Sequence, residues 1–235
     1  MPVSVNLIPL EGTYFDRAAL MERLTAGIRR GKRRIIFLVG SAVTAPQNGG
    51  AGVPLVDGIV ALIKTEFDDA AQIAEFEKVI GNSKNRYQAA FTFLLGRRGQ
   101  QAANEIIKKA VWKARRPVIT SDSNGNFEPT AETSDEACEI LDNDYEGWVL
   151  APSVDAIGKL ISAYPERFGR AILTTNFDPL IEVAIGQSGG QYFRTVLHRD
   201  GNLGQTQGPG CHVIHLHGYW HGADTLHTPR QLKVA

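Results

Sequence analysis

Short apolar runs that end in glycine or small polar residues are the feature that most restricts the fold of this chain. Residues 33–42 (RRIIFLVGSA), 170–178 (RAILTTNFD) and 211–218 (CHVIHLHG) each carry such a run. Residues 191–198 (QYFRTVLH) alternate between apolar and polar side chains. Continuous apolar runs of this length are typical of strands buried in a parallel sheet. The sequence therefore predicts strands at these four places.

Residues with helical periodicity lie between the predicted strands. They predict helices at 14–31, 53–66, 70–80, 85–96, 100–114 and 153–164, and residues 179–186 (PLIEVAIG) predict another. Strands separated by helices imply a parallel sheet with crossover connections. The predicted class is α/β: a Rossmann-like parallel sheet with crossover helices, a helical insertion at about 66–115 and an acidic loop at about 116–150. Residues 1–235 are predicted to form a single domain.

The composition argues against several classes of protein. The 25 basic and 25 acidic side chains balance, so direct binding to nucleic acid or to a membrane is not expected. The two cysteines, Cys138 and Cys211, form no C-x-x-C pair, which argues against a cysteine-rich zinc site. No apolar run approaches the roughly 20 residues that span a bilayer, and the amino terminus lacks the pattern of a signal peptide. We expect a cytoplasmic protein.

The ends of the predicted strands carry the candidate functional residues, because ligands of open α/β sheets bind beyond the carboxyl ends of the strands. The first strand ends in Gly40-Ser41-Ala42-Val43-Thr44, and GVP follows at 52–54. Small residues let backbone N–H groups approach a phosphate, although glycine in such a turn can also serve a purely steric need. The segment is neither a Walker motif nor a dinucleotide G-x-G-x-x-G, since Ala42 stands at the second glycine position.

The second strand ends in Thr174-Thr175-Asn176-Phe177-Asp178, which offers hydroxyls, an amide and a carboxylate. Asn176 or Asp178 could simply cap the helix that follows.

Four of the six histidines lie between residues 211 and 222. Strand alternation places His215 and His217 on one face, and Gly218 lets the chain turn there. A metal site of His215, His217 and His221 lacks an evident acidic ligand, so no metal is expected. A histidine-triad site is excluded because its third position is Tyr219. Two interpretations stay open: one histidine is a general base with the other beside it, or both are packed and hydrogen-bonded.

Taken in order, the three strand ends resemble those of the sirtuin superfamily. Sirtuins show G-A-G-x-S followed by G-I-P, then T-Q-N-x-D, then a strand ending in H-G. This chain has G-S-A-V-T with GVP, then TTNFD, then HLHG, over about residues 34–222. It looks most like the sirtuin-like domains at the amino terminus of bacterial anti-phage defence proteins, which hydrolyse NAD⁺. The resemblance implies that NAD⁺ is the substrate and that nicotinamide and ADP-ribose are the products.

The resemblance also implies the roles of individual residues. His217 would be the catalytic base, and Asn176 and Asp178 would act at the nicotinamide-ribose end. Gly40, Ser41, Ala42 and Thr44 would form the phosphate and ribose loop. Pro54, Asp57, Thr175 and His215 complete the predicted NAD⁺-binding set. Two positions depart from the sirtuin pattern: Ala42 replaces a glycine, and Asp57 stands roughly where many sirtuins have an arginine. No C-x-x-C pairs follow H-G, so the zinc ribbon of the protein deacylases is missing.

Other functions stay open beside NAD⁺ hydrolysis. A non-catalytic NAD⁺- or ADP-ribose-binding regulatory module ranks second, an NAD-dependent protein deacylase third, and a simple interaction domain last. The resemblance implies the toxic effector of an abortive-infection system, which must be silent at rest. We therefore expect a homo-oligomer and activation by a phage-derived trigger, a sensor domain or a partner protein. Sirtuin-like domains normally continue well beyond H-G, so the chain is expected to be the amino-terminal part of a longer protein.

Overall fold

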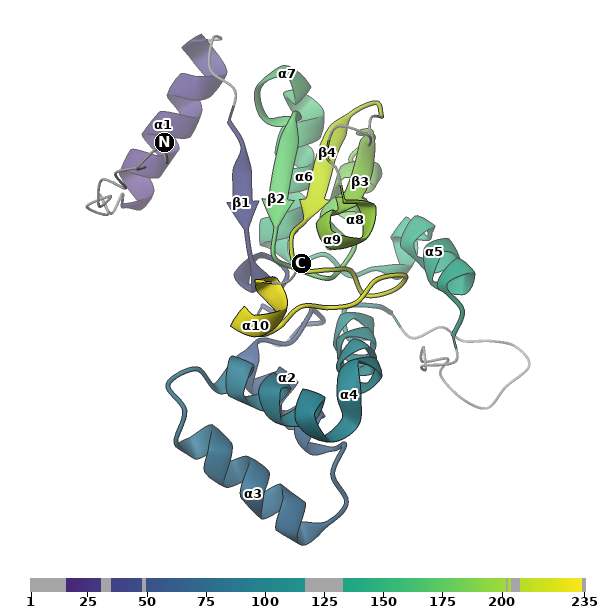
Figure 1. Ribbon diagram of the computed structural model, residues 1–235. Coiled ribbons are helices and arrows are strands. Elements are labelled where there is room, and N and C mark those ends of the chain that lie inside the picture. The colour runs from purple at the N-terminus through teal and green to yellow at the C-terminus, as the bar shows by residue number, and fades with distance from the viewer. Residues whose placement is uncertain are drawn as a thin grey trace, which may run out of the picture.

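A parallel sheet forms the centre of the protein. The computed structural model describes residues 16–30, 35–47, 50–116, 133–201, 203 and 208–233. Within them, the strands β1 (Phe37–Val39), β2 (Ala171–Thr174), β3 (Tyr192–Val196) and β4 (Cys211–His215) form a four-stranded sheet in the order β1-β2-β4-β3 (Figure 1). All three neighbouring pairs are parallel. The four strands lie where the apolar runs predict them, and the α/β class is confirmed.

The register brings the strand ends to one edge of the sheet. Val39 pairs with Thr174, Thr174 pairs with His215, and His215 pairs with Val196. The carboxyl ends of all four strands therefore lie at the same level, and the residues that follow them meet there. This is the edge at which open α/β sheets bind ligands.

Helices α6 (Pro152–Ala163) and α8 (Leu180–Gln187) pack on one face of the sheet, and α7 (Pro165–Phe168) lies at the amino end of β2 (Figure 1). The residues of α8 from Leu180 to Ile185 are all buried. Gly158 of α6 lies so close to α8 that a Cβ atom there would approach the carbonyl oxygen of Ala184 to 2.4 Å. Its glycine therefore permits the close packing of these two helices.

A helical lobe lies beyond the carboxyl edge of the sheet (Figure 1). It contains α2 (Val56–Lys64), α3 (Ala70–Gly81) and α4 (Arg86–Trp112), close to the predicted helices. The two helices predicted at 85–96 and 100–114 are both present within α4 and are divided at Gly99, whose φ of 81° is not helical and is a conformation that glycine adopts without strain. Phe67, Phe76 and Phe93 form an aromatic cluster in its core, with ring centroids 5.3–5.8 Å apart.

The segment predicted as an acidic loop contains a helix, which corrects that prediction. Helix α5 (Asp135–Asn143) begins after Ser134, whose hydroxyl accepts a hydrogen bond from the N–H of Ala137. The helix forms because Cys138 and Asp142 are buried against the rest of the protein. A 3₁₀ helix, η2 (Tyr145–Gly147), follows. Residues 117–132 of the predicted loop lie outside the described residues.

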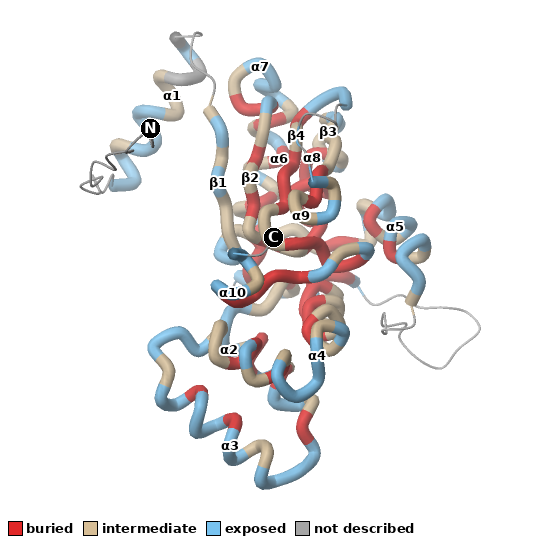
Figure 2. Tube along the Cα trace, in the orientation of Figure 1, coloured by how far each residue is buried: buried red, intermediate tan, exposed pale blue. Residues whose placement is uncertain are grey.

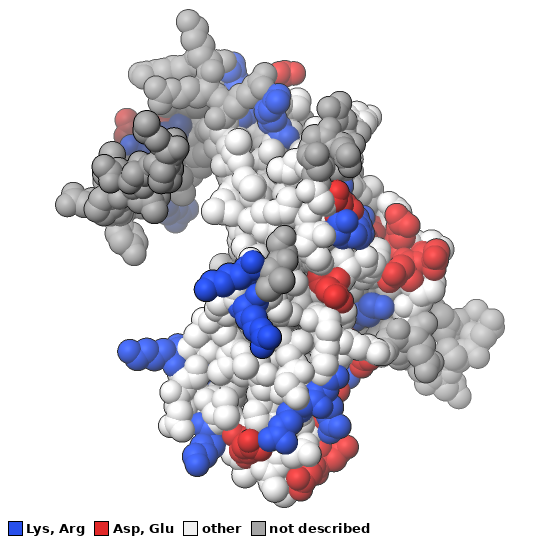
Figure 3. Space-filling view, viewed as in Figure 1, with Lys and Arg blue, Asp and Glu red and all other residues white. Residues whose placement is uncertain are grey.

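The remaining described helices are peripheral or short. They are α1 (Arg17–Arg30), the 3₁₀ helix η1 (Ser41–Val43), α9 (Leu197–Asp200) and α10 (Pro229–Leu232). Helix α1 lies alongside β1 (Figure 1), whereas α10 lies between the sheet and the helical lobe. On the face shown in Figure 3, acidic and basic side chains are interspersed over the helical lobe. No helix of the described residues is long and apolar enough to cross a membrane.

A buried carboxylate fixes the turn that follows β4. Asp142 of α5, only 3% exposed, accepts hydrogen bonds from the Tyr219 hydroxyl at 2.8 Å, the Trp220 indole at 2.9 Å and the His221 imidazole at 3.0 Å. Arg194 of β3 completes the set at 2.8 Å. Burial alone would raise the pKa of Asp142, but the bonds and charges of His221 and Arg194 outweigh it and hold the pKa below its ordinary value. Asp142 is therefore a charged anchor, and its hydrogen bond to His221 explains the position of that imidazole without a metal ion.

We predict that Asp142→Asn lowers the free energy of unfolding by more than about 2 kcal/mol at pH 7, because Arg194 loses its charged partner. A carboxylate with a depressed pKa stabilises the fold above its unfolded pKa, near 3.8, and this contribution is lost as the pH falls through the folded pKa. The gap between wild type and variant should therefore narrow below about pH 4. Urea unfolding across this range measures it.

Asp155→Asn is the matched control, since Asp155 forms an i,i+4 ion pair with Lys159 on the surface. Its expected cost is at most about 0.5 kcal/mol. Equal costs for the two variants would contradict the role given to Asp142.

Candidate active site

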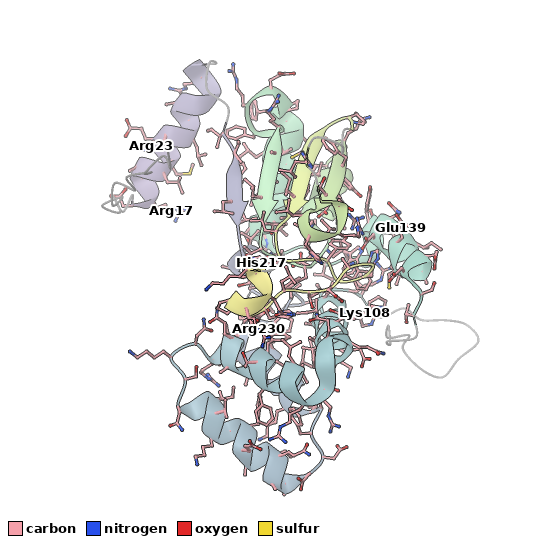
Figure 4. All side chains as sticks on the ribbon, in the orientation of Figure 1. Arg17, Arg23, Lys108, Glu139, His217 and Arg230 are labelled. Atoms are coloured by element: carbon pink, nitrogen blue, oxygen red, sulfur yellow. The ribbon has the colours of Figure 1, made fainter. Side chains whose placement is uncertain are left out.

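A cavity of about 340 Å³ opens at the carboxyl edge of the sheet, between the strand ends and the helical lobe. Figure 2 shows buried segments on both sides of this junction, and Figure 4 places His217 beside it, next to α10. Ligand cavities in proteins commonly start at about this size. Seven of the predicted residues line the cavity, namely Ser41, Thr44, Pro54, Thr175, Asn176, Asp178 and His217.

The loop after β1 reaches the cavity through η1. Gly40 precedes η1, and a Cβ atom at Gly40 would lie 3.2 Å from the Thr175 hydroxyl, so glycine lets this loop pass close to the end of β2. Ser41 and Thr44 both line the cavity, and Thr44 is completely buried from solvent. The loop is joined to the GVP segment by a backbone hydrogen bond from Val53 N–H to the Thr44 carbonyl at 3.0 Å.

The Thr44 hydroxyl connects the two polar residues that follow β2. It accepts a hydrogen bond from Asn176 Nδ2 at 3.0 Å and donates to Asp178 Oδ2 at 3.0 Å. A hydroxyl has one hydrogen and two lone pairs, so both bonds can form together. Thr44 therefore holds the side chains of Asn176 and Asp178 in fixed positions. The resemblance had placed Thr44 in the phosphate loop, and the structure adds this positioning contact.

Asp178 has an unusual electrostatic environment. The side chain is 1% exposed, and burial raises its pKa to about 6, although the hydrogen bonds from Thr44 and from the backbone N–H of Leu180 oppose the shift. The bond to Leu180 shows that Asp178 also caps the start of α8, as the sequence allowed. The helix-capping role and the position in the cavity thus belong to the same residue.

His217 lies just beyond β4, where the chain turns sharply. Its carbonyl accepts a hydrogen bond from Leu226 N–H at 2.7 Å. The next residue, Gly218, has φ 106°, and a Cβ atom there would come within 2.2 Å of the Asp224 carbonyl oxygen. Only glycine fits this turn, which explains the H-G pair in physical terms. Partial burial lowers the pKa of His217 below its ordinary value, so its imidazole is neutral at pH 7.

His215 has a different place from the one that strand alternation predicts. Strand β4 ends at His215, so the alternation does not extend to His217. The His215 ring is fully buried, with Nδ1 2.8 Å from the Asn176 carbonyl oxygen and Nε2 2.8 Å from Glu182 Oε1. It does not line the cavity, and it acts from behind by fixing the backbone of Asn176.

Three further residues of the predicted NAD⁺-binding set do not line the cavity. Gly40 and Ala42 belong to the loop after β1 but lie outside the lining. Asp57, at the start of α2, forms an ion pair with Arg86 at 2.5 Å, and its side chain is 83% exposed. This surface pair accounts for Asp57 without a ligand.

The cavity also contains residues that the sequence did not single out. Phe177 follows β2, Tyr87 comes from α4 and His227 from the segment before α10. Tyr87 belongs to an amphipathic helix and His227 to a short tail, so neither stands in a motif that marks a site. Among the described residues, no group of histidine, cysteine and acidic side chains could hold a metal ion.

Comparison with known protein families identifies part of the chain. Residues 170–233 match the SIR2-like domain, which confirms the sirtuin resemblance for this part. The match contains β2, β3 and β4 together with Asn176, Asp178 and His217. The loop after β1 and the helical lobe lie outside it. No curated protein matches the chain.

We predict that Asp178 makes the fold less stable as the pH rises. A carboxyl group whose folded pKa is raised binds more protons in the native than in the unfolded state between about pH 4 and about pH 6. The stability of the wild type relative to Asp178→Asn should therefore fall across this window and stay constant above it. Chemical unfolding of both proteins at pH 4–8 measures the difference, and a difference that does not change with pH would contradict the burial of a titrating carboxyl.

Proposed function

We propose that the chain is an NAD⁺ glycohydrolase that cleaves NAD⁺ to nicotinamide and ADP-ribose. A SIR2-like domain implies NAD⁺-related activity. The observation that carries the proposal is the fixed arrangement of Asn176, Thr44 and Asp178 in a cavity that also contains His217. The sirtuin resemblance assigns the reaction to Asn176, Asp178 and His217, and it places Thr44 in the phosphate and ribose loop.

The chemistry of the substrate suits these groups. The nicotinamide of NAD⁺ is a cationic leaving group, so the reaction needs little acid catalysis. It needs stabilisation of an oxocarbenium-like transition state and a positioned nucleophile. The bond between ribose C1′ and the pyridinium nitrogen breaks, and its electron pair goes to that nitrogen. A water oxygen then forms a bond to C1′ and releases a proton.

The roles of the three residues follow from their surroundings. His217 is neutral at pH 7 because its pKa is lowered, and it takes the proton from the water or from a ribose hydroxyl. Asn176 orients the water or the ribose hydroxyls, since Thr44 and His215 fix its side chain and its carbonyl. Asp178, whose pKa is raised to about 6, is ionised at pH 7 and places a negative charge beside the cationic ring.

The same proposal extends to the biological setting. By the resemblance to defence-associated domains, the activity serves an abortive-infection system and is silent until a phage-derived trigger or a partner protein releases it. Assembly into a homo-oligomer is part of this proposal. Size-exclusion chromatography with light scattering tests the assembly, and NAD⁺ consumption in infected and uninfected cells tests the setting.

We predict that His217→Ala and Asn176→Ala each lower the rate of NAD⁺ cleavage by about 10²–10⁴-fold. Chromatographic detection of nicotinamide and ADP-ribose from purified protein measures the rate. His212→Ala is the matched control, because His212 lies in strand β4 shortly before His217 but bonds to Thr195 and stacks on Phe193, outside the cavity.

The outcomes separate the alternatives. Full activity of His217→Ala would remove the general-base role. Calorimetric binding of NAD⁺ without product, also in the presence of the proposed trigger, would favour a regulatory binding module. Nicotinamide release that requires an acylated peptide would favour a deacylase.

A further inference from the structure

A hydrogen-bonded pair from the helical lobe and the carboxyl-terminal tail forms part of the cavity wall. The Tyr87 hydroxyl lies 2.9 Å from His227 Nδ1, and both residues line the cavity. His227 is 4% exposed and stacks flat on Phe91, with ring centroids 3.5 Å apart. Its other nitrogen, Nε2, lies 2.7 Å from the Thr225 hydroxyl. The direction of these bonds decides which groups the wall offers to a ligand.

Asn104 of α4 fixes one end of this chain of bonds. The backbone N–H of Thr225, which can only donate, lies 3.0 Å from Asn104 Oδ1. On the other side, Asn104 Nδ2 lies 2.9 Å from the Asp224 carboxylate. Each contact requires the same orientation of the Asn104 amide, so its Oδ1 faces Thr225.

The orientation of Asn104 then determines which atom donates in the hydrogen bonds of Thr225 and His227. The Thr225 hydroxyl is 2.9 Å from Asn104 Oδ1, which only accepts, so the hydroxyl hydrogen points to Asn104. The Thr225 oxygen must therefore accept the hydrogen bond from His227 Nε2. A neutral imidazole with its hydrogen on Nε2 accepts at Nδ1, and the Tyr87 hydroxyl consequently donates to it.

The protonation states support this direction. Burial, and then the positive charge that nearby His217 carries when protonated, lower the pKa of His227 to about 3, so the His227 ring is neutral and is no candidate for the base. Burial raises the pKa of Tyr87, so the phenol keeps its hydrogen. The Tyr87 hydroxyl uses that hydrogen in its hydrogen bond to His227, so its oxygen offers only lone pairs to the cavity.

The position of the pair points to the ring end of the ligand. The His227 ring lies 5.1 Å from the ring of Phe177, and Phe177 stands between Asn176 and Asp178 in the chain. Tyr87 and His227 thus line the same cavity as Asn176 and Asp178.

We infer that Tyr87 is a specificity-determining residue whose phenolic oxygen accepts a hydrogen bond from the carboxamide N–H of the nicotinamide ring, an inference that rests on the proposed NAD⁺ cleavage. A carboxamide has such a donor. The carboxylate of nicotinic acid has none and would bring its lone pairs against those of Tyr87, in a cavity that already contains Asp178. The site should thus select NAD⁺ against nicotinic acid adenine dinucleotide.

Calorimetric binding of the two dinucleotides to wild type and to Tyr87→Phe tests the inference. We expect wild type to prefer NAD⁺ by at least about tenfold, since a buried polar group is left unmatched in the other complex. The preference should fall by at least about threefold in Tyr87→Phe, which keeps the ring and removes the oxygen, while the repulsion from Asp178 persists. Tyr164→Phe, an exposed tyrosine outside the cavity, should keep the wild-type preference.

A second measurement needs neither turnover nor a folded variant of Tyr87. Nitrogen NMR of wild type labelled at histidine, with the His227 signal assigned by its loss in His227→Gln, should show the hydrogen on Nε2 and no titration between pH 5 and 8. A hydrogen on Nδ1, or equal preference in wild type and Tyr87→Phe, would overturn the inference, while release of nicotinamide from NAD⁺ by the wild type would still uphold the proposed function. Failure of wild type to bind either dinucleotide would overturn both, and the tautomer would still report on the hydrogen-bond chain.

Discussion

The geometry of the cavity depends on three buried carboxylates, each of which joins a different strand end to the rest of the protein. Asp178 accepts the Thr44 hydroxyl from the loop after β1, Glu182 bonds to His215 at the end of β4, and Asp142 bonds to Arg194 of β3 and to the turn at 219–221. All three are at most 3% exposed. A buried carboxylate is costly unless it is hydrogen-bonded or paired, so these contacts must form together. The strand ends are consequently fixed relative to one another before any ligand binds.

The sequence predicts the elements whose packing repeats a local pattern. The apolar run that contains β2 and the periodic residues of α2, α3 and α6 carry their own signal, because the burial that forms them follows from spacing along the chain. Helix α5 carries such a signal in part, since Ser134 caps its first turn and Cys138, Leu141 and Asp142 recur at helical spacing. The burial of the charged Asp142, however, depends on Tyr219 and Trp220, which lie far away in sequence. Hydrogen bonds over such a distance along the chain leave no local pattern.

The residues of the candidate site likewise divide into those that the sequence predicts and those that it does not. Asn176, Asp178 and His217 could be predicted, because parallel strands bring their carboxyl ends to one edge. The resemblance separates the roles of His217 and His215, but strand alternation alone could not, because it places both on one face whereas β4 ends at His215. Tyr87 and His227 were also beyond prediction: α4 and the tail meet only after the chain has turned at Gly218 and returned along the helical lobe. The contact between Leu226 N–H and the His217 carbonyl shows that the same return fixes His217 itself.

The hydroxyl groups around the cavity donate their hydrogen bonds away from it, and this bears on the chemistry of the cavity. Tyr87 donates its hydrogen away from the cavity, and Thr44 donates its hydrogen to Asp178 rather than into the space. His217 is neutral at pH 7 and has a lone pair, and Asp178 is ionised above about pH 6. A wall that offers lone pairs and a negative charge attracts a cation. In the proposed cleavage of NAD⁺, the pyridinium ring in the ground state and the oxocarbenium-like ribose in the transition state are both cationic, and as the bond breaks the charge moves from the ring to the ribose. A wall that only bound the ring tightly would stabilise the substrate and slow the reaction. The contact that we infer between Tyr87 and the carboxamide lies apart from the cationic nitrogen, so it leaves Asp178 and Asn176 to stabilise the charge on the ribose.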